Sequence, residues 1–311
     1  MEEYSFHEGV LPIAYSTDLA ISLFNKYEHI YLQSPEGWYT FYALHDKYKC
    51  VDCLMHVHVD GKEANSPLRA PFGGLECADD VAPAVLYAFL EFVTNRIREK
   101  GASVFTIKHA PQNYCYRQNA LTETFLLNIG FQVVDAEVGT IIEVKPDFIA
   151  HADTWEKRKL RQAQEAQLFF RTIDNESLDD VYLFILACRK QKGYSLSMTL
   201  ADLRKTVHEF PEQYYLFGIY HDGKLVAASI AVRVRENILY NFYSDHDKEY
   251  DAYSPVVMLL EGMHRFCVDN DIAMLDLGTS ATDGKPNFGL LDFKLRLGGK
   301  PTPKLTFRKT W

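Results

Sequence analysis

The sequence repeats itself at an offset of about 176 residues, and this internal repeat constrains the fold more than any other feature. The segment Trp38–Asp46 aligns with Tyr214–Asp222, and the two share Tyr, Phe, His and Asp at equivalent places. The elements predicted downstream of each segment keep the same order. We therefore expect two copies of one supersecondary unit.

The second half shows the pattern more clearly. Its predicted elements are strands over residues 214–220, 224–235 and about 237–243, a helix over 255–268, a strand over 273–277 and a helix over 290–297. Asp222-Gly223 is typical of a two-residue hairpin turn between the first two strands. Ser254 suits a helix N-cap and Pro255 a first helical position, while Gly298-Gly299 suits a helix end.

The first half repeats this order of elements. Its predicted elements are strands over residues 38–44 and 49–59, a weaker extended stretch toward 68, a helix over 82–99, a strand over 103–108 and a helix over 121–129. A closing strand is expected in each half, over 131–144 and 304–308, and additional helices are expected between 153 and 210. Lys145-Pro146-Asp147 marks the boundary, which predicts domains 1–147 and 148–311.

Composition is consistent with two folded domains. The chain has 311 residues, of which 47% are apolar and 24% charged. A formal net charge of −9 means that contact with nucleic acid or phosphate needs a local basic patch. The segment Met1–Ser5 lacks the features of a secretory signal, and no apolar run reaches the roughly 18 residues of a membrane span. With six scattered cysteines, these features predict a soluble, cytoplasmic protein with reduced thiols.

Two stretches resemble metal or phosphate motifs superficially. Cys50, Cys53, His56 and His58 are zinc-type ligands, but strand alternation places the cysteines on opposite faces. The stretch 278–285 follows a strand as a phosphate loop does, but its spacing is wrong by one residue and proline follows its lysine. The sequence predicts no metal site, and it contains no hydrolase, zincin or dinucleotide motif in a suitable context.

Basic residues gather at two places in this acidic chain. Lys157, Arg158 and Arg161 share one face of a helix that Asp153 is expected to cap, with Glu156 completing a capping box. From residue 294 onward the sequence contains no acid but several bases: Lys294, Arg296, Lys300, Lys304, Arg308 and Lys309. Such patches favour an anionic substrate or cofactor group, and the alternative for both is a solvated surface.

Five motifs in the second half together resemble the Fem-type (FemAB-like) branch of the GNAT acyltransferases. They are Arg158–Ala163, Asp222–Ala228, Tyr250–Pro255, Leu275–Gly278 and Gly289–Gly299. The first half matches by the order of its elements. The resemblance implies an α/β (α+β) fold of two tandem GNAT-like domains, each a mixed, mainly antiparallel sheet flanked by helices.

The resemblance also implies an activity. Such proteins transfer an acetyl or aminoacyl group from acyl-CoA, for example acetyl-CoA, or from aminoacyl-tRNA to an amine, here of a small molecule or a peptidoglycan precursor. Direct attack by the amine requires both substrates to be held together and the carbonyl to be polarised, and it requires no enzyme nucleophile. The alternative is a non-catalytic GNAT-fold protein that binds a ligand.

The implied site lies at the strand end near residue 243. Lys294 matches the lysine of the family's Phe-Lys motif, which is associated with substrate binding and charge stabilisation. Asp245 is the candidate base with His246 as the second choice, Tyr253 is a candidate proton donor, and a role as turn residues is the alternative for Asp245 and His246. Residues expected to bind substrate are Tyr243, His246, Arg158, Arg161, Ser254, Thr279 and Arg296.

The cofactor site departs from the usual GNAT pattern. Acyl-CoA-dependent members carry closely spaced glycines before the helix that binds the pyrophosphate, whereas this chain has Asp251–Pro255 there. In the first half, Arg69, Phe72, Gly73 and Gly74 precede a predicted helix and are the expected cofactor-binding residues, through backbone N–H groups at the helix start.

Overall fold

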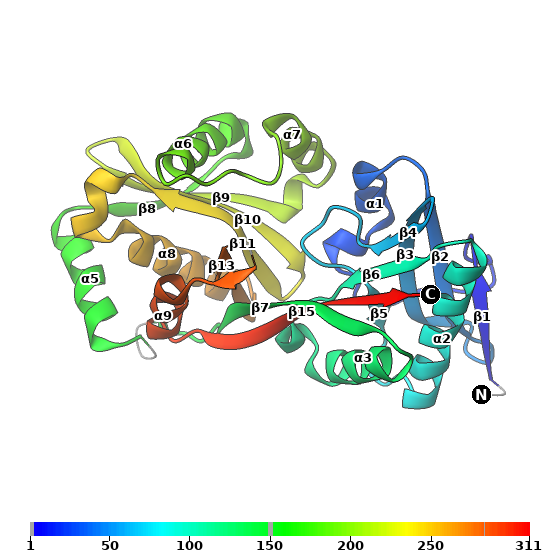
Figure 1. The fold of residues 1–311 in the computed structure, drawn as a ribbon. Helices are drawn as coiled ribbons and strands as arrows, with labels where there is room; N and C mark the ends of the chain where they lie inside the picture. The colour runs from blue at the N-terminus through cyan, green and yellow to red at the C-terminus, as the bar shows by residue number, and fades with distance from the viewer. Residues whose placement is uncertain (1–2, 149–151, 283) are drawn as a thin grey trace. The chain divides into compact units, whose positions relative to one another are not determined.

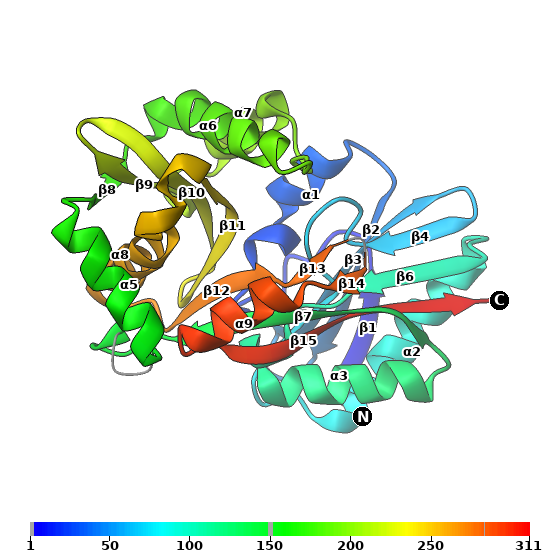
Figure 2. The same ribbon diagram turned by 60° about the vertical axis from the view of Figure 1, so that its left-hand side comes forward.

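The computed structural model describes residues 3–148, 152–282 and 284–311. Its contacts divide the chain into two compact units (Figures 1 and 2). Unit 1 consists of Met1–Glu137 together with Thr302–Trp311, and unit 2 consists of Val138–Pro301.

Unit 1 is a mixed sheet with helices on both faces (Figures 1 and 2). Its elements are β1 (Tyr4–Glu8), the 3-10 turn Leu23–Asn25, α1 (Tyr27–Gln33), β2 (Trp38–His45), β3 (Cys50–Asp60), β4 (Glu63–Ser66), β5 (Leu75–Cys77), α2 (Pro83–Glu99), β6 (Val104–Lys108), the 3-10 turn Gln112–Tyr114, α3 (Tyr116–Asn128) and most of β15 (Lys300–Thr310). The strand order is β1-β2-β3-β4-β6-β15. The core beneath α2 and α3 includes the buried rings of Phe41, Phe89, Phe105 and Phe307.

Unit 2 has helices on both faces of its sheet. Its elements are the end of β7 (Gln132–Glu143), α5 (Thr154–Glu165), β8 (Phe169–Ile173), α6 (Leu178–Gln191), α7 (Leu200–Glu209), β9 (Tyr214–His221), β10 (Lys224–Arg235), β11 (Ile238–His246), α8 (Pro255–Asp269), β12 (Met274–Thr279), the small hairpin β13 (Ala281–Thr282) and β14 (Lys285–Pro286), and α9 (Phe288–Arg296), with 3-10 turns at Asn175–Ser177, Pro211–Gln213 and Lys248–Tyr253. The strand order is β7-β12-β11-β10-β9-β8. Figure 1 shows α6 on one face of this sheet and α8 on the other.

Local signals explain several of these elements. Asp222 and Gly223 have φ angles of 47° and 78°, the two positive values that a type I′ hairpin turn requires. Asp153 caps α5 by accepting a hydrogen bond of 2.9 Å from the backbone N–H of Glu156. The predicted capping box is not completed, because the carboxylate of Glu156 accepts from Arg296 Nε at 3.0 Å and the N–H of Asp153 donates to the carbonyl of Arg296.

The two closing strands are exchanged between the units, and this corrects the prediction from the repeat. In unit 1, β15 pairs antiparallel with β6, with Phe307 opposite Ile107. In unit 2, β7 pairs antiparallel with β12, with Ile142 opposite Leu275. The strand 304–308 therefore does not close the second half, and the chain passes between units after residues 137 and 301.

The rest of the predicted order is confirmed, with small shifts at the ends. Both halves contain three strands, a helix, a strand and a helix in the expected sequence. The elements that were missed, β1, α1, β5, β8 and the hairpin β13–β14, are short segments without a clear apolar period. Within residues 3–148, 152–282 and 284–311, no helix has the length and apolar character to cross a membrane.

Candidate functional site

The candidate site of unit 2 begins where two neighbouring strands separate. Strands β11 and β12 pair in parallel over three residues, ending with Tyr240 opposite Asp276. Beyond this point β11 continues along β10, and a register shift leaves Phe242 as the extra residue of a β-bulge. The N–H of Gly278 donates to Asp276 Oδ1 at 2.7 Å, and Gly278 turns the backbone of β12 with a φ of 73°.

A cavity of about 390 Å³ lies at this separation. Its walls come from β11, β12, α8, α9, α6 and the loop after α6. The polar groups include Ser195, Ser197, Asn241, Ser244 and Thr279, and the apolar groups include Val256, Leu260, Leu277, Leu290 and Phe293. The cavity therefore combines an apolar wall with several hydrogen-bonding groups, as expected of a small-molecule site.

Lys294 lines this cavity and is buried, with 5% of its surface exposed. Its ammonium donates to the carbonyl oxygens of Gly278 and Thr279, at 3.0 and 2.9 Å. Both acceptors lie at the end of β12, so the lysine is held at the point where the strands separate. A buried cation with fixed geometry is suited to stabilising negative charge on a bound substrate.

Tyr243 also lines the cavity. Its hydroxyl lies 2.6 Å from Ser197 Oγ and accepts from the N–H of Met198 at 2.9 Å, which attaches the loop after α6 to β11. Burial raises the pKa of Tyr243, despite the opposing effect of these hydrogen bonds. The phenol therefore stays protonated at neutral pH and is able to donate a proton.

Asp245, the expected base, is not among the described residues that line the cavity. Its carboxylate accepts a hydrogen bond from Lys192 Nζ, accepts another from the N–H of His246 at 2.7 Å, and lies 3.8 Å from Arg189 Nε. These contacts occupy the carboxylate oxygens of Asp245 with partners from the chain itself. Asp245 thus lies next to Arg189, which does line the cavity, and its role as a base stays a prediction.

The other residues expected near the strand end also lie outside the described cavity lining. His246 directs Nε2 to Asp251 Oδ1 at 2.6 Å. Tyr253 is 39% exposed and its ring stacks on His221, so it is not placed to protonate a group in the cavity. Ser254 precedes α8 with a φ of 48°, a left-handed conformation that glycine adopts more readily.

The three arginines expected to bind substrate do not line the cavity either. Arg158 and Arg161 are exposed on α5, where Arg158 lies 4.6 Å above the ring of Trp155. Arg296 pairs with the buried carboxylate of Glu156. The structure thus brings together Lys294, Tyr243 and Thr279 from the predicted set and separates the three arginines from them.

The residues expected to bind cofactor in the first half are packed within unit 1, and their role stays a prediction. The N–H of Gly73 donates to the carbonyl of Lys108 at 2.9 Å, and that of Gly74 donates to Ser66 Oγ at 3.1 Å. Arg69 donates to the carbonyl of Gln33. Phe72 is buried between Phe24 and Tyr114. Because α2 begins at Pro83, the glycines are not at a helix start, and their N–H groups already have partners within the chain.

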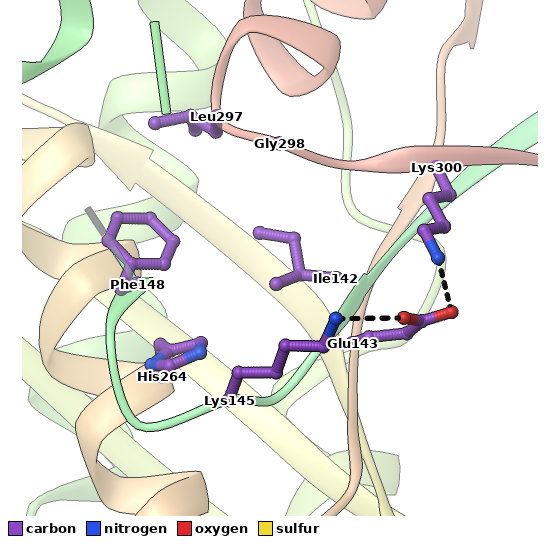
Figure 3. Close-up of a pocket in the computed structure, with 8 residues that line it drawn as sticks. All are labelled: Ile142, Glu143, Lys145, Phe148, His264, Leu297, Gly298 and Lys300. Carbon is purple, nitrogen blue, oxygen red and sulfur yellow. Dashed lines mark hydrogen bonds and ion pairs between the residues drawn. The ribbon is translucent and has the colours of Figure 1, made fainter. Parts of the chain in front are cut away.

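A second cavity in unit 2, of about 210 Å³, is shown in Figure 3. Phe148 lies beside His264, with ring centroids 5.0 Å apart, next to the apolar side chains Ile142 and Leu297. Lys145 and Lys300 both pair with Glu143, with N–O distances of 3.8 and 2.5 Å. The lysines are therefore paired within the cavity lining, which contains none of the predicted site residues.

Sequence reasoning missed the contributions of Arg189, Ser197 and Asn241 to the larger cavity. Arg189 belongs to the basic run Arg189–Lys192, but nothing in that run distinguishes the side chain that faces the cavity. In the part of the chain that the structure describes, no group of three or more His, Cys, Asp or Glu side chains is arranged to hold a metal ion. Asp283, inside the loop compared with a phosphate loop, lies outside the described residues.

Comparison with known families identifies the class of the domain that holds this cavity. Residues 152–294 match the family described as Acetyltransferase (GNAT) domain. The matched segment includes every described residue that lines the larger cavity, including Lys294. The part of unit 2 that holds the cavity is therefore similar to the GNAT acetyltransferase domain.

Solved structures extend the likeness to both units. FemX has a TM-score of 0.70 and 12% sequence identity, over 93% of this chain and 92% of FemX. A conserved protein of unknown function from Bacteroides thetaiotaomicron VPI-5482 has a TM-score of 0.57 and 12% identity, over 95% of this chain and 93% of that chain. The C-terminal domain of a putative lysylphosphatidylglycerol synthetase from Agrobacterium fabrum has a TM-score of 0.54 and 11% identity, over 83% of this chain and 80% of that chain.

These findings confirm the predicted resemblance to the Fem-type branch of the GNAT superfamily and the predicted fold class of two tandem GNAT-like domains. No curated protein matches the sequence. At the identities found, the structural likeness establishes the fold, and the activity has to be argued from the cavity.

Proposed function

We propose that this protein is an N-acyltransferase whose reaction takes place in the larger cavity of unit 2. The observation that carries the proposal is Lys294: a lysine with 5% exposure lines a cavity at the strand separation of a GNAT domain. Burying an ammonium group costs free energy of desolvation, and lysine is therefore among the residues least often buried. We take the burial of Lys294 as a sign of a functional role.

The proposed chemistry is direct attack. The nitrogen of a neutral amine attacks the carbonyl carbon of a thioester or ester, and the carbonyl oxygen becomes negatively charged in the tetrahedral intermediate. The ammonium of Lys294 stabilises this charge or a phosphate of the donor. The C–S or C–O bond then breaks. The phenol of Tyr243 is proposed to donate its proton to the leaving group, and the proton that the attacking amine loses restores the phenol.

Acyl-CoA is the proposed donor, with acetyl-CoA as the first example to test. The resemblance to the Fem-type branch supports aminoacyl-tRNA as the competing donor. It also supports a peptidoglycan-precursor amine as the acceptor that competes with a small molecule. The left-handed turn at Ser254 gives α8 a sharp start without glycine, and Pro255 removes one N–H there. The reaction is proposed to occur in the cytoplasm, where both donors are found.

The test is acyl transfer by the purified full chain. Labelled acetyl-CoA and aminoacyl-tRNA are each offered with a panel of amines, and the product amide is measured. We expect transfer from one donor, and at least a tenfold lower kcat in Lys294→Met, which corresponds to about 1.4 kcal/mol of transition-state stabilisation.

The matched control is Lys205→Met, which removes an exposed lysine of α7 in the same unit. We expect this control to keep the wild-type rate. Full activity in Lys294→Met would remove the role assigned to that residue. Donor binding without transfer to any amine would favour the alternative, a non-catalytic GNAT-fold binding protein, which is consistent with the lack of a carboxylate among the described cavity residues.

A further inference from the structure

We infer that the substrate entering the larger cavity carries an acidic group, a carboxylate or a phosphate, and that Arg189 binds it. Asp245 is assigned as the positioning residue that holds Arg189. The inference names the substrate class of the proposed function and in that sense rests on it, but it is argued from charge and geometry and is tested by binding alone.

The first argument is the charge of the lining. The chain carries a formal net charge of −9, with 42 acidic and 33 basic side chains. Among the described residues that line the cavity, two are cationic, Arg189 and Lys294, and none is Asp or Glu. A local reversal of charge in an acidic protein favours an anion inside the cavity.

The second argument is the bonding of Arg189. Its Nη2 donates to the carbonyl of Ser244 at 3.3 Å, and this is its one side-chain hydrogen bond within the described part of the chain. Its Nε is buried without a hydrogen-bond partner there. A guanidinium has five N–H donors in a planar fork that matches a carboxylate or a phosphate. The rest of the fork therefore has no hydrogen-bond partner within the described part of the chain.

The third argument concerns how Arg189 is held. Asp245 lies 3.8 Å from Arg189 Nε, beyond hydrogen-bond distance, while it accepts directly from Lys192. One carboxylate thus faces two cations, so the group of three keeps a positive charge. Asp245 is buried behind the lining, where it orients the guanidinium without competing for the ligand.

The cavity in Figure 3 provides a contrast. There, Lys145 and Lys300 both pair with Glu143, and that carboxylate is itself part of the lining. The larger cavity instead combines its cations with an apolar wall that includes Val256, Leu260 and Leu290. The chemistry predicts a substrate with an acidic group joined to an apolar part.

The test is titration calorimetry of the full chain with three probes at low salt. Hexanoate and phenyl phosphate supply the two acids, and hexanamide is a neutral analogue of hexanoate with nearly the same shape. We expect one or both acids to bind at least tenfold more tightly than hexanamide, and the preferred acid identifies the group. Two results would overturn the inference. One is equal binding of hexanoate and hexanamide with no binding of phenyl phosphate, and the other is no binding of either acid up to millimolar concentration.

Variants assign the effect to Arg189. We expect Arg189→Gln to lower the affinity for the preferred acid at least tenfold, and Arg189→Lys, which keeps the charge without the fork, to give an intermediate value. The control is Lys190→Gln, which removes an adjacent exposed cation of α6 and is expected to bind as wild type does. Unchanged affinity in a folded Arg189→Gln variant would contradict the assignment.

Asp245→Asn tests the positioning role. We expect weaker binding of the acid with unchanged binding of hexanamide, a difference that a general loosening of the cavity would not produce. These measurements need no turnover, so the two proposals fail separately. If acids bind through Arg189 but no acyl transfer occurs, the proposed function fails and the inference stands. If acyl transfer occurs but acids are not preferred, the inference alone fails.

Discussion

The carboxylate of Asp245 follows the strand end at which a base was expected, yet its contacts are with Lys192, the N–H of His246 and Arg189. The hydrogen-bond and ion-pair partners of a charged residue thus indicate more about its role than its position along a strand does. Lys294 shows the opposite case, because a motif named it and the structure places it in the cavity lining. Its catalytic role stays a prediction.

Two buried histidines of unit 1 predict a pH dependence of stability. Burial lowers the pKa of His29 and of His56 to about 4, against an ordinary value near 6.5. Between these values the unfolded chain binds protons that the folded chain does not. The free energy of unfolding of unit 1 should therefore fall as the pH falls from about 6.5 to about 4, by up to roughly 1.4 kcal/mol per pH unit for each histidine.

Native-state hydrogen exchange of β3 at several pH values measures this dependence. We expect a shallower slope in His29→Gln and in His56→Gln than in the wild type. His208→Gln, a change at an exposed position of α7 in unit 2, should leave the slope unchanged. An equal slope in the wild type and in both buried variants would show that other groups cause the dependence.

At the scale of elements, two helical glycines are expected to respond oppositely to the same substitution. A Cβ on Gly262 of α8 would overlap the ring of Phe170 on β8, whereas a Cβ on Gly289 of α9 would meet its nearest atom at 3.8 Å. Gly262→Ala should cost about 1–3 kcal/mol through overpacking, although alanine favours helix. Gly289→Ala should be neutral or stabilising by up to about 1 kcal/mol.

Urea unfolding of the two variants checks this prediction. Phe170→Leu in the Gly262→Ala background should recover part of the lost stability, because the smaller side chain vacates the space that the new methyl group needs. Equal midpoints for Gly262→Ala and Gly289→Ala would mean that Phe170 moves aside at no cost.

Most of the element order was predictable from the sequence, because hairpin turns, helix caps and apolar periods are local signals. Asp222-Gly223 and Pro255 both fall where the sequence places them. The strands with which the two closing strands pair were not predictable. The alternation of apolar and polar residues indicates that Phe307 and Ile142 are buried, but it does not indicate in which of the two cores. A helix was likewise expected in the region of α6. Which of its side chains faces the cavity depends on tertiary packing, and that side chain is Arg189.

For the whole molecule, the exchanged strands predict how the chain can be divided. Residues 3–147, cut at the predicted boundary, lack β15 and expose β6 as an unpaired edge beside an incomplete core. Residues 3–137 joined by a short linker to 302–311 should fold, because Lys304 Nζ and Glu137 Oε2 lie 3.5 Å apart and a few residues span the gap.

Circular dichroism and amide NMR dispersion of the two fragments distinguish these cases. We expect cooperative unfolding for the rejoined fragment and little tertiary structure for residues 3–147. Phe307→Ala in the rejoined fragment should destabilise it by about 3–5 kcal/mol, because Phe307 has no exposed surface. A well-folded fragment 3–147 would show that β15 is dispensable to unit 1.

The exchange of strands also sets the order in which the units can be completed on the ribosome. Proteins usually fold from the N-terminus as they are synthesised, at about 5–20 residues per second. Here unit 1 has to wait until the whole of unit 2 and then residues 302–311 have emerged, a delay on the order of ten to thirty seconds at that rate. During that interval the edge of β6 is unpaired and can pair with other nascent chains. A chain that terminates near residue 301 would therefore leave unit 1 incomplete, although unit 1 is the part that is synthesised first.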